Sequence, residues 1–327
     1  QNGGLGNLLL DDIAFIDEET HLRQKNTELQ CNDVLLNITG ASIGRSALVD
    51  KQIVGGNVNQ HVCIIRTKEN LVPSFICSFL LSNYGQRQID SCQVGGNRQG
   101  LNFEQIKSIK ITIPSKDEQI KIAKLLRAID ERIATQNKII DKLQSLIKGL
   151  RVCCMQRNGS NNVYLSEIAQ IYQPQTISSA ELTEDGFLVY GANGIIGKYK
   201  DYNHKTEQIC ITCRGNTCGM VNYTKPMSWI TGNAMVINTD KYQDKVYKKY
   251  LYHYLSAYNF NSIISGSGQP QIVRTPLEKL KITLPTISEQ KQKAIIFDKI
   301  QDKIDINHKV LNLYIGQKQY LLRQMFI

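Results

Sequence analysis

The clearest hydrophobic pattern in the chain lies in two long segments that contain almost no helix-breaking residues. Between Lys116 and Val152 only Gly149 interrupts helical composition, and a second such segment fills the C-terminal end of the chain. In both segments seam positions follow alternating spacings of three and four, which is typical of a helical coiled coil. The first seam is Leu126, Ile129, Ile133, Gln136, Ile140, Leu143 and Ile147, and the second is Phe297, Ile300, Ile304, Asn307 and Leu311. We expect two long helices packed against each other.

Each predicted helix carries a polar residue inside its seam, Gln136 in the first and Asn307 in the second. A buried polar residue fixes the register of a helix pair at some cost in stability. Each helix could instead be the amphipathic edge of its own domain. Against this, a helix over residues 116–152 would be about 55 Å long, well above the usual length. We expect N-caps at Ser115 and Ser288, because Ser commonly caps a helix start.

The second feature is an imperfect duplication. Residues 109–114 (IKITIP) match residues 280–285 (LKITLP) at an offset of 171. Further upstream, residues 34–40 match 209–215, and the Gly-rich residues 95–101 match 265–272. A period this long indicates a module used twice rather than a solenoid.

Both modules have the same predicted order of elements. A short β-type run (62–65 or 234–237) precedes an amphipathic helix (74–81 or 248–257), a Gly-rich loop, a strand ending at Pro114 or Pro285, and a long helix. This order predicts an α+β fold that occurs twice, each time as a mixed domain followed by a long helix. The predicted boundaries are 1–114 for the first domain, 115–157 for its helix, 158–285 for the second domain and 286–327 for its helix.

Charge and composition point to a polyanionic partner. The formal net charge is +10 and the pI about 9.1, which favours nucleic acid. No apolar run approaches the ~20 residues that span a bilayer. Nine cysteines, an odd number lying mostly in apolar stretches, indicate reduced thiols in a cytoplasmic protein.

Candidate DNA-contacting residues lie on loops that carry polar and basic side chains. Bases are read through hydrogen bonds to their edges, while Lys and Arg on phosphates position the protein. The alternative is that these are ordinary turn residues. The candidates are Thr39, Ser42, Arg45, Asn97, Arg98 and Gln99 in the first module, and Lys198, Lys200, Tyr202, Arg214, Asn216, Thr217, Gln269, Gln271 and Arg274 in the second.

Catalytic and metal-binding signals are weak. The pattern Cys210-x-x-Cys213 with Cys218 invites a zinc site, but the matching positions in the first module are Leu35, Ile38 and Ile43. That alignment favours small buried hydrophobic residues over metal ligands. The sequence has no phosphate-binding loop, no nucleophile elbow, no His-Glu-x-x-His pattern and no adenine methyltransferase motif. We expect neither a catalytic site nor a cofactor in this chain.

A known family resembles this ordered set of motifs. The set comprises Asp33–Leu36 leading to residues 40–44 (GASIG), residues 110–114 (KITIP), Glu118-Gln119, and residues 125–130 (LLRAID) before the long helix. Together they resemble the specificity subunits of type I restriction–modification enzymes. The second half repeats most of the pattern, so the resemblance covers nearly the whole chain.

The resemblance implies two target-recognition domains, each reading half of a split site in double-stranded DNA. It implies that the two long helices pack antiparallel and separate these domains, which relates the halves by pseudo-two-fold symmetry. It also implies partners: two modification subunits that carry S-adenosylmethionine, and restriction subunits. The second module opens with residues 165–169 (LSEIA), and the first lacks such an opening, so we expect the N-terminal part of the first domain to be missing. Two rival functions are a helical adaptor without DNA readout and a fused methyltransferase or nuclease.

Overall fold

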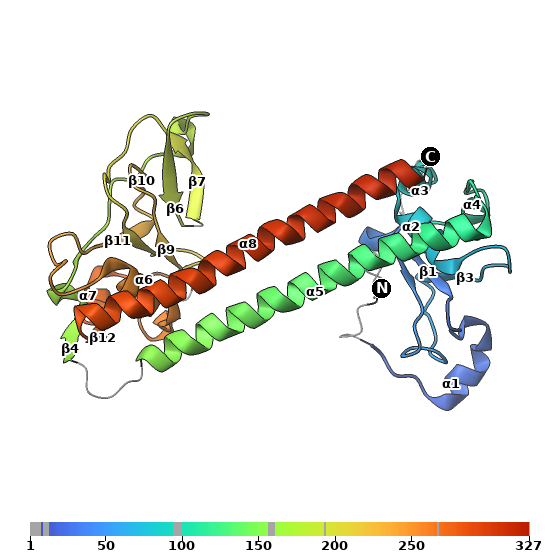
Figure 1. Ribbon diagram of the computed structural model, residues 1–327, viewed down its shortest axis with the longest axis horizontal. Helices are drawn as coiled ribbons and strands as arrows, with labels where there is room; N and C mark the ends of the chain where they lie inside the picture. The colour runs from blue at the N-terminus through green and yellow to red at the C-terminus, as the bar shows by residue number, and fades with distance from the viewer. Residues whose placement is uncertain are drawn as a thin grey trace. The chain divides into compact units, whose positions relative to one another are not determined.

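The computed structural model divides the chain into two compact units (Figure 1). It describes residues 8, 13–93, 100–155, 161–192, 194–266 and 268–326. Unit 1 comprises residues 1–139 and 307–327, and unit 2 comprises residues 140–306. Each unit contains one α+β domain and a stretch of both long helices, α5 (Lys116–Met155) and α8 (Ile287–Met325). The two long helices expected from the seam pattern are confirmed.

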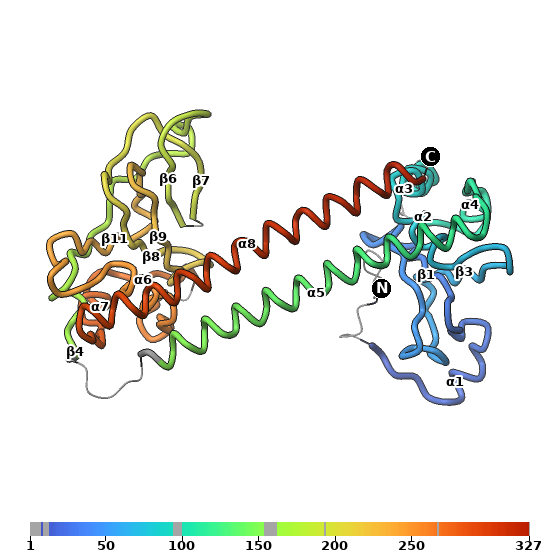
Figure 2. Tube along the Cα trace, in the orientation of Figure 1, coloured from blue at the N-terminus to red at the C-terminus, as the bar shows by residue number. Residues whose placement is uncertain are grey.

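Unit 1, whose N-terminal segments are blue in the trace of Figure 2, is built on a small antiparallel sheet with the strand order β2-β1-β3. The buried side chains Phe75, Ile76, Phe79 and Leu80 of α2 form the centre of its core. The elements are α1 (Glu18–Arg23), β1 (Val34–Asn37), β2 (Ser46–Leu48), β3 (Val62–Ile65), α2 (Pro73–Leu81), α3 (Asn83–Ser91) and α4 (Phe103–Lys107).

Unit 2 has the larger domain, with sheets in the orders β5-β11-β8-β9, β10-β6-β7 and β12-β4. Its strands are β4 (Asn161–Tyr164), β5 (Gln170–Tyr172), β6 (Phe187–Gly191), β7 (Gly194–Tyr199), β8 (Ile209–Thr212), β9 (Val221–Tyr223), β10 (Trp229–Ile230), β11 (Ala234–Asn238) and β12 (Lys281–Leu284). Its shorter helices are α6 (Lys248–Ala257) and α7 (Arg274–Glu278). The amphipathic helices expected at 74–81 and 248–257 are present as α2 and α6.

The sequence duplication is also a duplication of topology. In unit 1, β1 lies between β2 and β3; in unit 2, β8 lies between β9 and β11, and all four pairings are antiparallel. Leu36 pairs with Cys63 in one sheet, and its counterpart Ile211 pairs with Met235 in the other. Each module therefore places equivalent residues at equivalent strand positions.

In both units the seam residues turn away from solvent, and α5 and α8 run antiparallel. In unit 1 the amide of Gln136 donates to Asn307, and Lys318 pairs with Asp130. In unit 2 Ile147, Phe297 and Ile304 form one buried cluster. Leu126, Ile129 and Ile140 are also buried, and Ile133, Leu143, Ile300 and Leu311 are half-buried.

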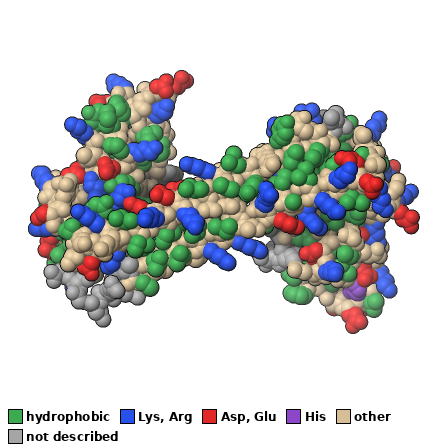
Figure 3. Space-filling view, viewed as in Figure 1, with side chains coloured by type: hydrophobic (Ala, Val, Ile, Leu, Met, Phe, Trp, Pro, Cys, Tyr) green, Lys and Arg blue, Asp and Glu red, His purple; other side chains and the backbone are tan. Residues whose placement is uncertain are grey.

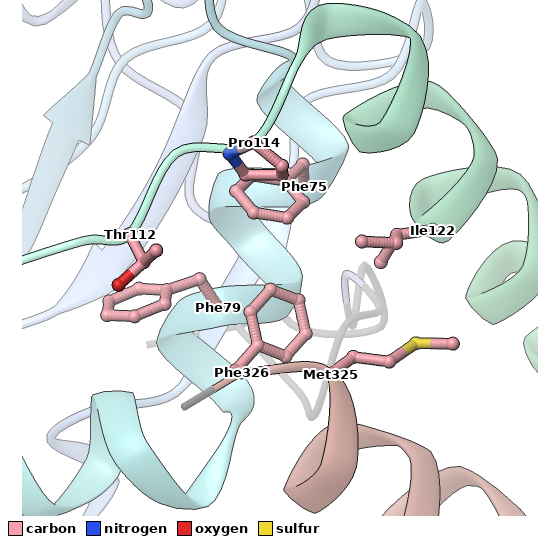
Figure 4. A pocket seen from close by; sticks show the side chains of 7 residues that line it. All are labelled: Phe75, Phe79, Thr112, Pro114, Ile122, Met325 and Phe326. Atoms are coloured by element: carbon pink, nitrogen blue, oxygen red, sulfur yellow. The ribbon is translucent and has the colours of Figure 1, made fainter.

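The last turn of α8 is anchored in the core of unit 1. The ring of Phe326 lies 5.2 Å from that of Phe75 and 6.0 Å from that of Phe79, measured between centroids (Figure 4). A cavity of about 230 Å³ beside them is lined by Phe75, Phe79, Thr112, Pro114, Ile122, Met325 and Phe326. Its lining is almost wholly apolar, which suits packing rather than base recognition.

A polar network anchors α5 in unit 2. The Arg151 guanidinium donates to Nδ1 of His253 at 2.8 Å. Nε2 of His253 lies 2.9 Å from Asp298, and Lys249 donates to the same carboxylate at 2.7 Å. His253 is only 1% exposed. The counterpart of Arg151 in the other module, at the offset of 171, is the buried core residue Leu322.

A buried glutamine in the first turn of each long helix connects three segments of its own unit. Gln119 accepts from the Val72 amide at 2.9 Å and donates to the carbonyls of Asn70 and Pro114. Gln290 makes the corresponding bonds to Tyr247, Lys245 and Pro285. The repeated glutamine thus fixes the helix start against the N-terminus of α2 or α6.

Two sequence expectations are wrong. Residues 109–114 form no strand. In unit 2 the equivalent segment, β12, pairs with β4, whereas in unit 1 the Gln88 side chain bonds both the N–H and the C=O of Lys110 and takes the place of a partner strand. The cap of α8 is Thr286 rather than Ser288. Thr286 accepts from the Glu289 N–H, while the Glu289 carboxylate accepts from the Thr286 N–H. Ser115 does cap α5.

Candidate nucleic-acid interface

The two modules share one tight turn, which follows the first strand of the common sheet. We refer to residues 39–45 as the unit 1 turn and residues 214–220 as the unit 2 turn. Gly40 and Gly44 have φ of 69° and 82°, and their counterparts Gly215 and Gly219 have φ of 85° and 90°. A side chain would strain the backbone at all four positions, so glycine is required there.

Backbone hydrogen bonds hold the two turns in the same conformation. In the unit 1 turn the N–H groups of Ile43, Gly44 and Arg45 donate to the carbonyls of Gly40, Asn37 and Ser42 at 3.2, 3.0 and 3.1 Å. In the unit 2 turn Cys218, Gly219 and Met220 donate to Gly215, Thr212 and Thr217 at 2.9, 2.9 and 3.0 Å. Every bond has a counterpart at an offset of 175 residues.

A second loop joins each turn at the same place. The Leu101 N–H donates to the Ile38 carbonyl at 2.8 Å, and the Ile272 N–H donates to the Cys213 carbonyl at 3.0 Å. Thr39 forms an antiparallel bridge with Gly100, and Arg214 forms the equivalent bridge with Gln271. Two candidates that are far apart in sequence, Arg214 and Gln271, are therefore directly opposite each other.

The unit 2 turn and its partner loop expose a group of polar side chains. Arg214, Asn216, Gln269 and Gln271 are all exposed. Segments 192–200, 214–220 and 265–274 contain no acidic residue. The charged side chains of these three segments are therefore all basic, which suits a phosphate-bearing ligand.

Several other candidates already have structural roles. The Thr217 hydroxyl donates to the Ala192 carbonyl at 3.0 Å, and the ring of the half-buried Tyr202 packs on Phe187. Lys198 pairs with Asp185, and Arg274 pairs with Glu278 one helical turn away in α7. The exposed Lys200 extends over the Tyr199 ring, 6.0 Å from its centroid.

The candidate residues of unit 1 differ from one another in how exposed they are. Thr39 is half-buried and bonds His61 at 2.7 Å, and Ser42 is buried with an unsatisfied hydroxyl. Arg45 is exposed. Asn97, Arg98 and Gln99 lie outside the described residues.

The three cysteines considered as zinc ligands pack against apolar clusters. Cys210 and Cys213 are buried, and Cys218 is half-buried. Burial raises the pKa of Cys210 to about 12, which disfavours the thiolate that binds metal. Across the residues that the structure describes, no cluster of His, Cys, Asp or Glu is arranged to hold a metal ion.

Exposed side chains that are not among the sequence candidates lie on both the turns and the helices. Ala41 and Met220 are exposed in the two turns, and the offset of 175 would have marked them. On α8, Leu313 is 72% exposed and Tyr320 is 62% exposed. Leu313 and Tyr320 are seven residues apart and lie outside the seam, and this spacing is the sequence pattern that indicates a second apolar face. On the face shown in Figure 3, green apolar side chains are interspersed with Lys and Arg.

The duplicated fold matches a known protein family in both of its halves. Residues 6–145 and 158–313 match the family model described as type I restriction modification DNA specificity domain. The chain belongs to this family. Its members are specificity subunits, the non-catalytic components that support recognition of a DNA sequence.

Two relatives illustrate the extent of the similarity. The type I restriction enzyme EcoprrI specificity subunit of Escherichia coli is 31% identical over 140 residues, or 41% of this chain and 34% of that protein. The chain thus matches about a third of that relative's length. The type I restriction enzyme MjaVIII specificity subunit of Methanocaldococcus jannaschii is 24% identical, over 85% of this chain and 74% of that protein.

Solved structures show the same fold. The S subunit of a type I restriction–modification system from M. genitalium has a TM-score of 0.69 at 18% identity, covering 92% of this chain and 85% of that one. A chain from a study of complex assembly and conformational transition of the type I R-M system has a TM-score of 0.60 at 16% identity, covering 90% and 81%. Among the described helices, none has both the length and the apolar character needed to cross a membrane.

Proposed function

We propose that the chain reads a bipartite target in double-stranded DNA, one half through each unit. In this proposal residues 1–114 and 158–285 are the recognition domains, and the helical segments 115–157 and 286–327 set the spacer. The helices also bind two modification subunits, which supply S-adenosylmethionine and methylate adenine, and restriction subunits join this assembly. Such an assembly would work on cytoplasmic DNA.

The observation that supports this proposal best is the recurrence of one turn, with its partner loop, in both units. A module that is used twice in one chain matches a target with two separate halves. The matched backbone hydrogen bonds hold both turns in the same conformation, whereas the exposed side chains of the two turns differ. An adaptor that bound only proteins would have no need for loops free of acidic residues, as residues 39–45 are in unit 1 and residues 214–220 and 265–274 are in unit 2.

The candidate residues fall into two roles. Lys198, Lys200 and Arg274 are basic side chains suited to phosphate contacts, which position a protein without reading sequence. Arg214, Asn216 and Gln271 are the types that form paired hydrogen bonds with base edges. The buried Ser42 and the bonded Thr217 and Tyr202 support the loops.

Salt-dependent DNA retention by the chain assembled with its modification subunits tests this proposal. Affinity for duplex DNA should fall about a thousandfold between 50 and 200 mM salt, as expected when several phosphates are neutralised. Retention that is absent at 50 mM salt, with the complex intact, would leave the helical adaptor as the better account. Methyl transfer by the isolated chain would instead favour the fused methyltransferase.

A further inference from the structure

The two equivalent turns differ in the side chains that they expose. At four exposed or half-exposed positions the unit 1 residues are Thr39, Ala41, Arg45 and Gly100, and their unit 2 counterparts are Arg214, Asn216, Met220 and Gln271. The positions that hold the fold do not change in this way. All four positive-φ positions of the two turns are glycine, and the residue two positions after the first glycine carries a hydroxyl in each unit, Ser42 or Thr217.

We infer that these turns are the sequence-reading elements and that Arg214 and Gln271 together read adjacent base pairs in the unit 2 half-site. The inference rests on the proposed function. An unchanged backbone with exchanged exposed side chains is what two half-sites of different sequence require. In the unit 1 half-site the reader is the exposed Arg45, which stands at the position of Met220 rather than at that of Arg214.

The bridge between Arg214 and Gln271 gives the pair its geometry. Residues directly opposite in an antiparallel bridge have Cβ atoms about 5 Å apart and direct their side chains to the same face. That separation is close to the ~3.4 Å rise between base pairs. The two side chains can therefore reach neighbouring base pairs in one groove of the DNA.

The chemistry of the pair indicates which bases are read. An arginine donates two hydrogen bonds to O6 and N7 of guanine, and a glutamine bonds N6 and N7 of adenine. Arg274 and Lys198 pair with carboxylates, whereas Arg214 and Arg45 form no ion pair among the described residues. These two arginines can therefore bind guanine without breaking an existing ion pair.

The test is the methylated motif of the chain assembled with its modification subunits, before and after Arg214→Gln. Methylation of sites with guanine at one position of one half-site should fall about 10- to 100-fold relative to sites with another base there. The other half-site should stay unchanged. Gln271→Ala should relax the preference for adenine at the neighbouring position, and Arg45→Gln should alter only the opposite half-site.

Arg274→Gln is the matched control, because it removes the same charge from a side chain that pairs with Glu278. It should lower methylation of all sites equally and leave the motif intact. An Arg214→Gln complex that methylates the same motif with the same base preferences would overturn the inference. A wild-type complex that methylates no split motif would instead count against the proposed function.

Discussion

His253 shows how a single buried side chain can be assigned a protonation state from its partners. Arginine has only hydrogen-bond donors, so Nδ1 of His253 must accept from Arg151 and carry no proton. Its proton is then on Nε2 and points to Asp298. Burial, with a smaller contribution from Arg151, lowers the pKa of His253 to about 4, outweighing the bond to Asp298. The contact is a hydrogen bond of a neutral imidazole rather than an ion pair.

This assignment predicts a pH dependence of stability. The pKa of His253 is near 6.5 when the chain is unfolded and about 4 when it is folded. The unfolded state therefore binds more protons between these values, and stability is lost as the pH falls from 7 toward 4. The contribution is at most about 3 kcal/mol in the free energy of unfolding. Denaturant titrations at several pH values would measure it.

The His253→Gln variant should show a flatter pH profile of unfolding than the wild type, because the amide does not titrate. Equal slopes for wild type and His253→Gln over this range would contradict the neutral, buried assignment.

At the scale of elements, α8 carries large apolar side chains that are exposed. Leu313 and Tyr320 lie on successive heptads outside the seam, and both are mostly exposed. Large apolar side chains repeated on one helix face mark a surface that another helix can cover. We propose that a modification subunit packs there.

Leu313→Asp should weaken binding of the modification subunit at least tenfold, because it introduces a charge into an apolar contact. Titration with the labelled modification subunit would give the dissociation constant. Asn312→Asp adds the same charge at an exposed neighbouring position around the helix and should have little effect. Equal affinities for both variants would place the docking face elsewhere.

Helices were the elements that sequence predicted best, because their apolar spacing repeats over many turns. The start of α8 was missed, since Ser288 and Thr286 are both good caps. Only the reciprocal bonds with Glu289 decide between them. The offset of 171 from Ser115 leads to Thr286 and would have given the correct cap.

Pairing between distant segments was harder to predict. Nothing in residues 109–114 reveals that the Gln88 amide occupies the place of a strand partner. In the same way, Arg214 and Gln271 were separate loop candidates, and only the fold places them opposite each other. Neither relationship is encoded by local propensity, because both depend on how separate loops meet.

At the scale of the whole molecule, the duplicated module is the central feature. Two units share a sheet topology, a glycine-framed turn and a buried glutamine at the helix start. They differ in the exposed side chains of the turn and in how the long helices are anchored, through Leu322 and Phe326 in unit 1 and Arg151 in unit 2. One recognition design applied to two different DNA half-sites would produce this combination of shared and differing features.

Mapping methylated adenines tests that account most directly. The chain would be purified with its modification subunits, supplied with S-adenosylmethionine and given a library of random duplex DNA. We predict methylation within a split motif, two short specific sequences separated by a spacer of fixed length and unspecified sequence. Methylation of a single continuous motif, or of adenines without any shared sequence, would contradict the account.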